Sequence, residues 1–401
     1  MPPVADLDEV ASSIADGFSL TRGGPLHRLQ VRFGAAEDSY TRAIRRATVV
    51  TLLAWLPLFL LSLAQGVAYG DSVKIPFLRD FAVNVRFLIA LPILILSEPG
   101  IDRRWRTLVL EFVRSGLVRE TKLSSFQRLL DKVTRLRDRV LPEALMLVAA
   151  FLPSLLMRDS ELLIGGASNW HVASQGFGTI SLAGWWFKLI SQPLFRFLLL
   201  RWTWRMFLWA SFLWGVSRID LFLVATHTDK AAGLGFLSEG QRRFSPIVFA
   251  GGAVMAAQVG NAIAYEGATL STMKFVLVAY GVIAVLVLIA PLLVVTPLLI
   301  KTKKEALLEY GRLVTRHDQL FHEKWVECRR AQSEVLLGNR AASSLADLGT
   351  SFGVVRDMSV VPIDRATLTS LATAAALPML PVVLFATSAS DLLRIMLRML
   401  A

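Results

Sequence analysis

The stretch FRFLLLRWTWRMFLW runs from Phe195 to Trp209 and is almost wholly apolar and aromatic, yet it contains Arg196, Arg201 and Arg205. In a soluble protein it would be an unusual core. At the centre of a bilayer, each arginine would cost roughly 3 kcal/mol or more. The fold class therefore depends on the solvent around this stretch, and the function depends on what neutralises its charges.

The composition of the chain favours lipid as that solvent. Of 401 residues, 54% are hydrophobic and 18% are charged, whereas soluble domains carry about 25% charged residues. The apolar residues form long runs that alternate with basic segments, as in polytopic membrane proteins. The single cysteine, Cys328, excludes an intrachain disulfide and a multi-cysteine metal site. We expect no signal peptide in residues 1–46.

We predict an all-α fold, a polytopic transmembrane helical bundle with about seven spans. A helix needs about 20 apolar residues to cross the hydrocarbon, and lipid offers no partner for unpaired backbone groups. The runs are too long and uniform for the alternating strands of a barrel. The predicted spans are 47–69, 81–98, 141–157, 185–214, 245–265, 274–300 and 368–387.

Lysine and arginine in the loops predict the orientation. The tail before the first span holds six such residues, and the segments 99–140, 215–244 and 301–367 hold eleven, four and eleven. The other loops hold two, one and one. We therefore expect the N-terminus and the three basic segments to be cytoplasmic, in a bacterial inner membrane, and the C-terminus outside. This distribution also accounts for most of the net charge of +12, so we expect no nucleic-acid partner.

The same pattern divides the chain. We predict a partly disordered cytoplasmic tail, 1–46, and a six-span membrane region, 47–300, with a cytoplasmic helical insertion and a cytoplasmic loop. A cytoplasmic helical segment, 301–367, precedes 368–401, which holds the last span and an interfacial helix. The insertion is 99–140 and the loop is 215–244.

Two cytoplasmic segments, 121–140 and 303–329, have apolar residues at helical spacing and predict amphipathic helices. The second presents Leu307, Tyr310, Val314, His317, Phe321, Trp325 and Cys328 at steps of three or four. We expect the two helices to pack on each other below the membrane. A coiled-coil interface with a partner is the alternative, although the seam covers barely three heptads.

Three strings in the second half resemble a family of uncharacterised multi-pass bacterial inner-membrane proteins. They are RIDLFLVATHTDKAAGLGFL (218–237), LLEYGRLVTRH (307–317) and SLADLGTSFGVVRDMSVVPI (344–363). The resemblance covers roughly residues 180–400 and implies a membrane protein of the bacterial inner membrane. It implies no activity and no functional residue. Members of the family often have proline where this chain has Thr228.

The arginines of the opening stretch are the first candidate site, for an anion or an anionic lipid. Arg201 and Arg205 lie about 40° apart on a helix, whereas Arg196 lies about 180° from Arg205. Glu98 and Glu143, at predicted cytoplasmic span ends, are candidate ion-pair partners. Stacking on Trp202 or Trp209 would contribute about 0.5–2 kcal/mol. A structural ion pair, a lipid contact and an anion pathway all remain open.

The loop THTDKAAGLGFL (226–237) is a second candidate. Gly233 and Gly235 would let backbone amides approach a phosphate, with Lys230 as a point charge. The alternative is a structural turn, in which Thr228 or Asp229 caps a short helix.

The span 245–265 contains a stripe of small residues, Gly252, Ala256, Gly260 and Ala264, that would let helix backbones approach closely. Gln258 and Asn261, three residues apart, would hydrogen-bond across that contact. Close packing inside one bundle, a polar strip along a pathway and a homo-oligomer seam are the three interpretations.

We expect no cofactor. All five histidines fall outside the predicted spans, which argues against a transmembrane haem. Asp318 and His322 share a helical face and are a weak metal candidate, with a solvated polar face as the alternative. No familiar catalytic motif occurs.

These observations favour a channel or transporter, for anions. The alternatives are a membrane scaffold or sensor that acts through its cytoplasmic helices, and an intramembrane enzyme on lipid-linked substrates. Transport predicts a polar path past 185–214 and 245–265. A scaffold predicts a closed apolar bundle with an exposed cytoplasmic seam, and an enzyme predicts a lateral cleft with clustered titratable groups.

Overall fold

The protein, in a computed structural model, consists of helices joined by loops over the residues whose backbone is described. The described residues are 18–24, 40–156, 169–171, 180–327 and 340–386. Over these ranges no strand forms, and only two isolated β-bridges occur. The all-α prediction is confirmed for this part of the chain.

Five helical stretches among the described residues are long and apolar enough to cross a membrane, and a bent pair makes a sixth. The predicted span 185–214, which carries the three arginines, corresponds to α8 (Leu182–Trp186), η5 (Phe187–Ser191) and α9 (Gln192–Val216), and it is not among the six. The six are Tyr40–Ala64, Phe81–Arg114, Phe236–Tyr265, Leu270–Leu293, Arg365–Ala386 and the pair Glu120–Arg137 with Val140–Leu156.

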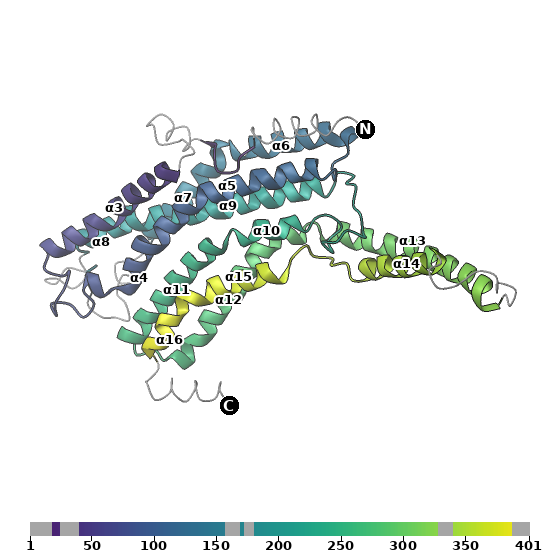
Figure 1. Cartoon of the computed structure of the whole chain (residues 1–401). Coiled ribbons are helices and arrows are strands. Elements are labelled where there is room, and N and C mark those ends of the chain that lie inside the picture. Colours follow the sequence, from purple (N-terminus) through teal and green to yellow (C-terminus); the bar gives the residue numbers. More distant parts are fainter. Residues whose placement is uncertain (1–17, 25–39, 157–168, 172–179, 328–339, 387–401) are drawn as a thin grey trace, which may run out of the picture.

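The helices form two packed groups and an arm (Figure 1). The first group holds α8, η5 and α9 together with α3 (Tyr40–Ala64), α4 (Phe81–Val85), η2 (Arg86–Ala90), α5 (Leu91–Arg114), α6 (Leu123–Arg137) and α7 (Val140–Leu156). The second holds α10 (Phe236–Arg242), α11 (Ser245–Tyr265), α12 (Leu270–Leu293), α15 (Arg365–Ala376), η8 (Leu377–Met379) and α16 (Leu380–Ala386). Contacts of α11 with α4 and α5, and of α12 with α9, join the two groups.

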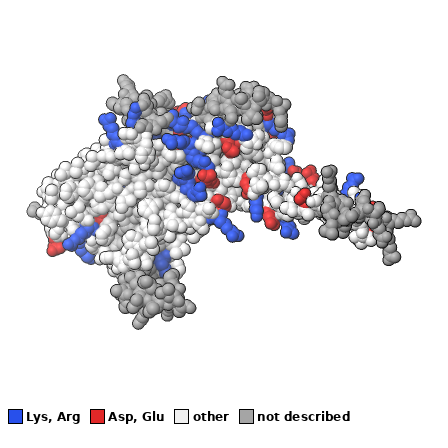
Figure 2. Space-filling model, viewed as in Figure 1, with Lys and Arg blue, Asp and Glu red and all other residues white. Residues whose placement is uncertain are grey.

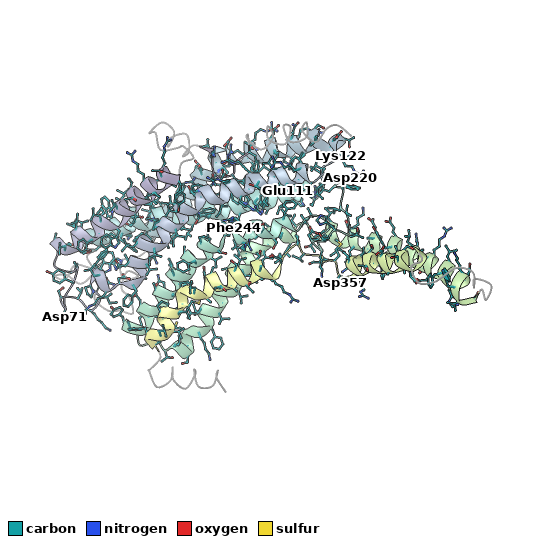
Figure 3. The ribbon with its side chains drawn as sticks, viewed as in Figure 1. Asp71, Glu111, Lys122, Asp220, Phe244 and Asp357 are labelled. Carbon is teal, nitrogen blue, oxygen red and sulfur yellow. The ribbon has the colours of Figure 1, made fainter. Side chains whose placement is uncertain are left out.

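Aromatic side chains fill the core where the two groups meet. Trp105 of α5 stacks on Trp209 of α9, with ring centroids 5.9 Å apart. Phe244, just before α11, contacts Trp105 at 5.7 Å and Trp202 at 6.3 Å (Figure 3). Rings of this size bury a large apolar area, so α9 is fixed firmly between α5 and the second group.

The loops gather at two opposite ends according to their charge. At one end, Ile75 bridges to Asn169 and the Lys74 Nζ donates to the carbonyl of Tyr265 at 3.2 Å. At the other end, Val118 bridges to Leu221. Figure 3 shows Asp71 at the first end and Lys122 and Asp220 at the second. The loops with few basic residues and the basic loops therefore lie at separate ends, as the alternation of charge requires.

The surface follows the same division. In Figure 2, lysine and arginine gather in a band across the middle of the molecule, and the surface to the left of that band is white except for a small charged group at its far lower edge. An uncharged belt bounded by basic residues is the surface that a bilayer needs.

Reporter fusions test the orientation directly. Because basic loops stay in the cytoplasm, fusions after Glu120, Gly235 and Tyr310 should read as cytoplasmic. Fusions after Ile75 and Trp170 should read as periplasmic. Periplasmic readings at both Trp170 and Gly235 would show that α8–α9 does not carry the chain across the membrane.

Part of the predicted tail is docked on the body. Ser19 Oγ donates to Asp102 Oδ1 of α5 at 2.7 Å, and the amides of Leu20 and Thr21 donate to the same oxygen at 3.1 Å. Phe18 packs on Phe212, with centroids 5.8 Å apart. Residues 18–24 of the tail that we predicted to be partly disordered are therefore held on α5, because a buried carboxylate needs hydrogen-bond donors and this segment supplies them. The rest of 1–39 lies outside the described residues.

The arm is a hairpin of α13 (Thr296–His322), extended by η6 (Glu323–Glu327), and α14 (Arg340–Arg356) (Figure 1). Every described residue of the predicted seam is half-buried, and His317 Nε2 lies 3.3 Å from Ser344 Oγ of α14. We predicted that the segments 121–140 and 303–329 pack on each other, and this was wrong. The first forms α6, which packs on α9, and the second lies in α13, which packs on α14. Cys328 lies outside the described residues.

Candidate functional site

Glu98 of α5 is the centre of a buried charge cluster. Its Oε1 lies 2.8 Å from Nη1 of Arg205 on α9, and its Oε2 pairs with Nη2 of Arg46 on α3. Both side chains of the Glu98–Arg205 pair are almost fully buried, at 6% and 3% exposed. The guanidinium of Arg205 also lies over the Trp202 ring, 4.8 Å from its centroid. The expected partner Glu98 and the expected stacking on Trp202 are both present.

Arg201 adds a charge that this carboxylate does not fully neutralise. Its side chain is buried and lies close enough to Arg205 to repel it and to Glu98 to be attracted. Within the described part of the chain, Arg201 has no hydrogen bond or ion pair, and Arg205 Nη2 has no partner either. Three guanidinium groups therefore share one carboxylate, and among the described residues neither Arg201 nor Nη2 of Arg205 has a hydrogen-bond partner.

Glu143 and Trp209 play smaller parts than expected. Glu143 of α7 attracts Arg201 electrostatically, but more weakly than Glu98 does. Trp209 stacks on Trp105 and Phe212 rather than on Arg205. The cluster is thus built from α3, α5 and α9, and α7 acts on it from a distance.

Arg196 lies apart from the cluster, as its position on the helix predicts. Its Nη1 donates to Ser154 Oγ of α7 at 2.8 Å. It is half-buried, whereas Arg201 and Arg205 are buried. The three arginines therefore do not line one wall together.

Two further buried cations, Arg86 and Lys188, lie in π-helical segments, and we did not predict them from the sequence. Arg86 is the first residue of η2, and Lys188 is the second residue of η5. Arg86 Nη1 donates to Gln192 Oε1 at 2.9 Å, and Phe87 packs edge-on against Phe187 at 6.3 Å. Both cations are buried. A charge inside an apolar run was the available signal, and π-helical turns often occur at functional sites.

A buried carboxylate, Asp80, lies close enough to Arg86 to attract it. It accepts from the Val83 amide at 3.1 Å, from Trp170 Nε1 at 3.1 Å and from Asn261 Nδ2 at 2.9 Å. Burial, the largest influence, lowers the pKa of the neighbouring His171 to about 4. This histidine is therefore neutral at physiological pH, and it adds no charge beside Arg86.

The loop 226–237 folds into a closed turn. The Asp229 carboxylate accepts from the amides of Ala231 and Gly235 at 2.8 Å and of Gly233 at 3.2 Å. Burial opposes its ionisation, but these hydrogen bonds outweigh burial and lower the pKa of Asp229. Of the two interpretations, these hydrogen bonds favour the structural turn, because the loop's own carboxylate takes the amides of Gly233 and Gly235. Lys230 is exposed and has a positive φ of 56°.

The stripe on α11 serves packing at one end only. A Cβ on Gly252 would lie 2.7 Å from Pro378 Cγ and 2.9 Å from the Ala375 carbonyl, whereas one on Gly260 would lie 3.7 Å from its nearest neighbour. Ala256 is buried, but Ala264 is exposed and lies outside the contact.

Of the two polar residues expected at that contact, one takes part. Asn261 accepts from the Phe81 amide at 3.0 Å and donates to Asp80. Gln258 is exposed, so its predicted role was wrong. The reason is rotation: α11 turns the Asn261 face, not the Gln258 face, toward α4.

The weak metal candidate gains no support. His322 Nε2 lies 3.6 Å from Glu327, both side chains are more than half exposed, and Asp318 is exposed. Among the described residues, no group of three metal-ligating side chains comes together. The solvated polar face is the better interpretation.

Comparison with protein-family models, curated proteins and solved structures gave no match. The candidate site is therefore defined by its geometry alone.

Proposed function

We propose that the protein is a channel or transporter for a small inorganic anion, which binds at Arg201 and Arg205. One observation carries the proposal: three arginines surround one buried carboxylate, Nη2 of Arg205 is buried without a partner, and the buried Arg201 forms no ion pair among the described residues. Excess positive charge in a dry site is costly unless it is paired. An anion would supply the missing charge and accept the unused hydrogen bonds.

The cations along α8, η5 and α9 support movement of that anion as well as binding. From Lys188 to Arg205 the helix rises about 26 Å, close to the hydrocarbon thickness of about 30 Å. Arg86 and Lys188 lie toward the end with few basic loops, and Arg46, Arg201 and Arg205 lie toward the basic end. Two clusters at different depths would let an anion pass from one to the other, because several weak sites allow entry and release.

A scaffold or sensor is the second candidate, and the arm favours it. The α13–α14 hairpin projects from the body, and Leu308, Leu313 and Leu320 on it are 62%, 59% and 57% exposed. Exposed apolar side chains on a projecting helix are typical of a surface that binds a partner. An enzyme on lipid-linked substrates is less favoured, since the lateral cavity described below has no titratable group in its lining.

Anion flux into liposomes tests the proposal. Purified protein in liposomes should pass chloride, nitrate or phosphate faster than protein-free liposomes, and Arg201→Gln should lower the rate by tenfold or more. Arg218→Gln is the matched control, since Arg218 follows the same helix but is exposed. A wild-type rate no higher than that of protein-free liposomes would exclude transport of the anions tested and leave the scaffold as the better candidate.

We also propose that the protein lies in the bacterial inner membrane and is related to the family that it resembles. These proposals rest on the alternation of basic loops and on the three strings of the second half of the chain. The separation of the loops into two ends supports the same orientation, with the basic end in the cytoplasm.

A further inference from the structure

The second group of helices contains a groove that is independent of the arginine cluster. It runs between α11 and the stretch α15–η8–α16, and two cavities occupy it. One has a volume of about 590 Å³ and lies beside the start of α11. The other has a volume of about 380 Å³ and lies further along the same helix. Phe249 lines both, so the cavities adjoin each other.

The residues that line the groove recur at helical spacing. On α11 and just before it they are Arg242, Ser245, Phe249, Ala253, Ala256 and Gly260, at steps of three or four. Such residues share one face of a helix. From Ser245 to Gly260 this face is about 23 Å long, which is longer than one leaflet of a hydrocarbon core about 30 Å thick. The two cavities are therefore one groove parallel to the helix.

The two ends of the groove differ in chemistry. The first cavity has Arg242 and four hydroxyl side chains in its lining, and Ser245 Oγ lies 3.0 Å from Ser370 Oγ. The second cavity is lined by apolar residues alone. Glu239 is 3.6 Å from Arg242 but only 2.9 Å from Arg104, so it neutralises Arg242 only in part.

The apolar cavity opens toward lipid. Three of its lining residues, Phe81, Ile89 and Phe385, are 40%, 41% and 64% exposed. Small residues create the space, because Ala253, Ala256 and Gly260 leave room that larger side chains would fill. A groove with one cationic, hydroxyl-rich end and one apolar end, open at the side, matches the shape and charge of a phospholipid.

We propose that this groove binds one anionic phospholipid from the leaflet at the basic end of the molecule. The phosphate lies at Arg242, Ser245 and Ser370, and one acyl chain lies in the apolar cavity along α11. The proposal does not depend on anion transport, which concerns the other group of helices.

Native mass spectrometry and thermal unfolding in a maltoside detergent test this proposal. Wild-type protein should retain one phospholipid, and added phosphatidylglycerol should raise its Tm more than phosphatidylcholine does. Ala253→Leu should fill the apolar cavity and abolish both the bound lipid and the Tm shift. Ala264→Leu, the same change on an exposed part of α11, should leave both intact. Any rise in Tm that inorganic phosphate causes should persist in Ala253→Leu, because it arises at the arginine cluster and not in this groove.

Arg242 decides the preference for an anionic head. Arg242→Gln should still retain one lipid but lose the preference for phosphatidylglycerol, whereas Arg243→Gln, its neighbour outside the lining, should keep it. If Ala253→Leu retains the lipid and the Tm shift as Ala264→Leu does, the groove is not the binding site. If Arg242→Gln prefers phosphatidylglycerol as strongly as Arg243→Gln does, the headgroup assignment is wrong.

Discussion

Replacing Glu98 with glutamine is expected to destabilise the protein by about 3–5 kcal/mol, the cost of leaving a buried charge without its partner. The Glu98 carboxylate lies between Arg205, at 2.8 Å, and Arg46, with Arg201 close by. Without its charge, three guanidinium groups would repel one another in a buried site. The measurement is thermal or denaturant unfolding in detergent.

A double variant shows whether the lost stability comes from charge repulsion or from a loss of packing. In Glu98→Gln/Arg205→Leu, one positive charge is removed together with the negative one, so part of the stability should return. Glu305→Gln is the control, because Glu305 forms an exposed pair with Lys301 at 3.8 Å and exposed pairs contribute about 0–1 kcal/mol. Equal stability of the single Glu98 variant and wild type would mean that the carboxylate does not neutralise the arginines.

Gly252→Ala and Gly260→Ala are expected to have opposite effects on the same helix. Each replacement gains up to about 1 kcal/mol of helix propensity. At Gly252 the new Cβ would lie 2.9 Å from the backbone oxygen of Ala375. Overpacking of this kind costs about 1–3 kcal/mol, and Gly252→Leu should cost more.

At Gly260 the new Cβ would make ordinary contacts with Phe81 and Val382, at 3.7 and 3.9 Å. Gly260→Ala should therefore leave the free energy of unfolding unchanged or raise it. Tm values of the two variants in one detergent provide the comparison. If both alanines lowered the Tm equally, the close contact between Gly252 and α15 would not explain the effect, since any substitution of a glycine on α11 would then be destabilising.

Local sequence pattern predicted the helices and the direction of several side chains. Apolar length located helices that could cross a membrane at five or six of the seven predicted spans, and helical angles placed Arg196 on a different side from Arg201 and Arg205. The scarcity of acidic residues at span ends identified Glu98 as a partner. Each of these inferences uses spacing within one helix or a count of rare residues, which a sequence displays directly.

Pairings between distant segments were not predictable in the same way. Nothing local couples Arg46 to Glu98, Ser19 to Asp102, or α13 to α14 in place of α6. The loop 226–237 shows the same limit. Its glycines indicate a turn, but only the folded loop shows that the Asp229 carboxylate takes the amides.

The central claim is that Arg201 and Arg205 bind an anion, and anion-dependent unfolding tests it most directly. Tm is measured at constant ionic strength while nitrate, phosphate or chloride replaces a large anion that cannot enter the bundle. A ligand at 100 times its Kd stabilises a protein by about 2.7 kcal/mol. The account predicts a clear rise in the Tm of wild type and of Arg218→Gln, and none in a folded Arg201→Gln variant. The same rise in all three proteins would contradict it.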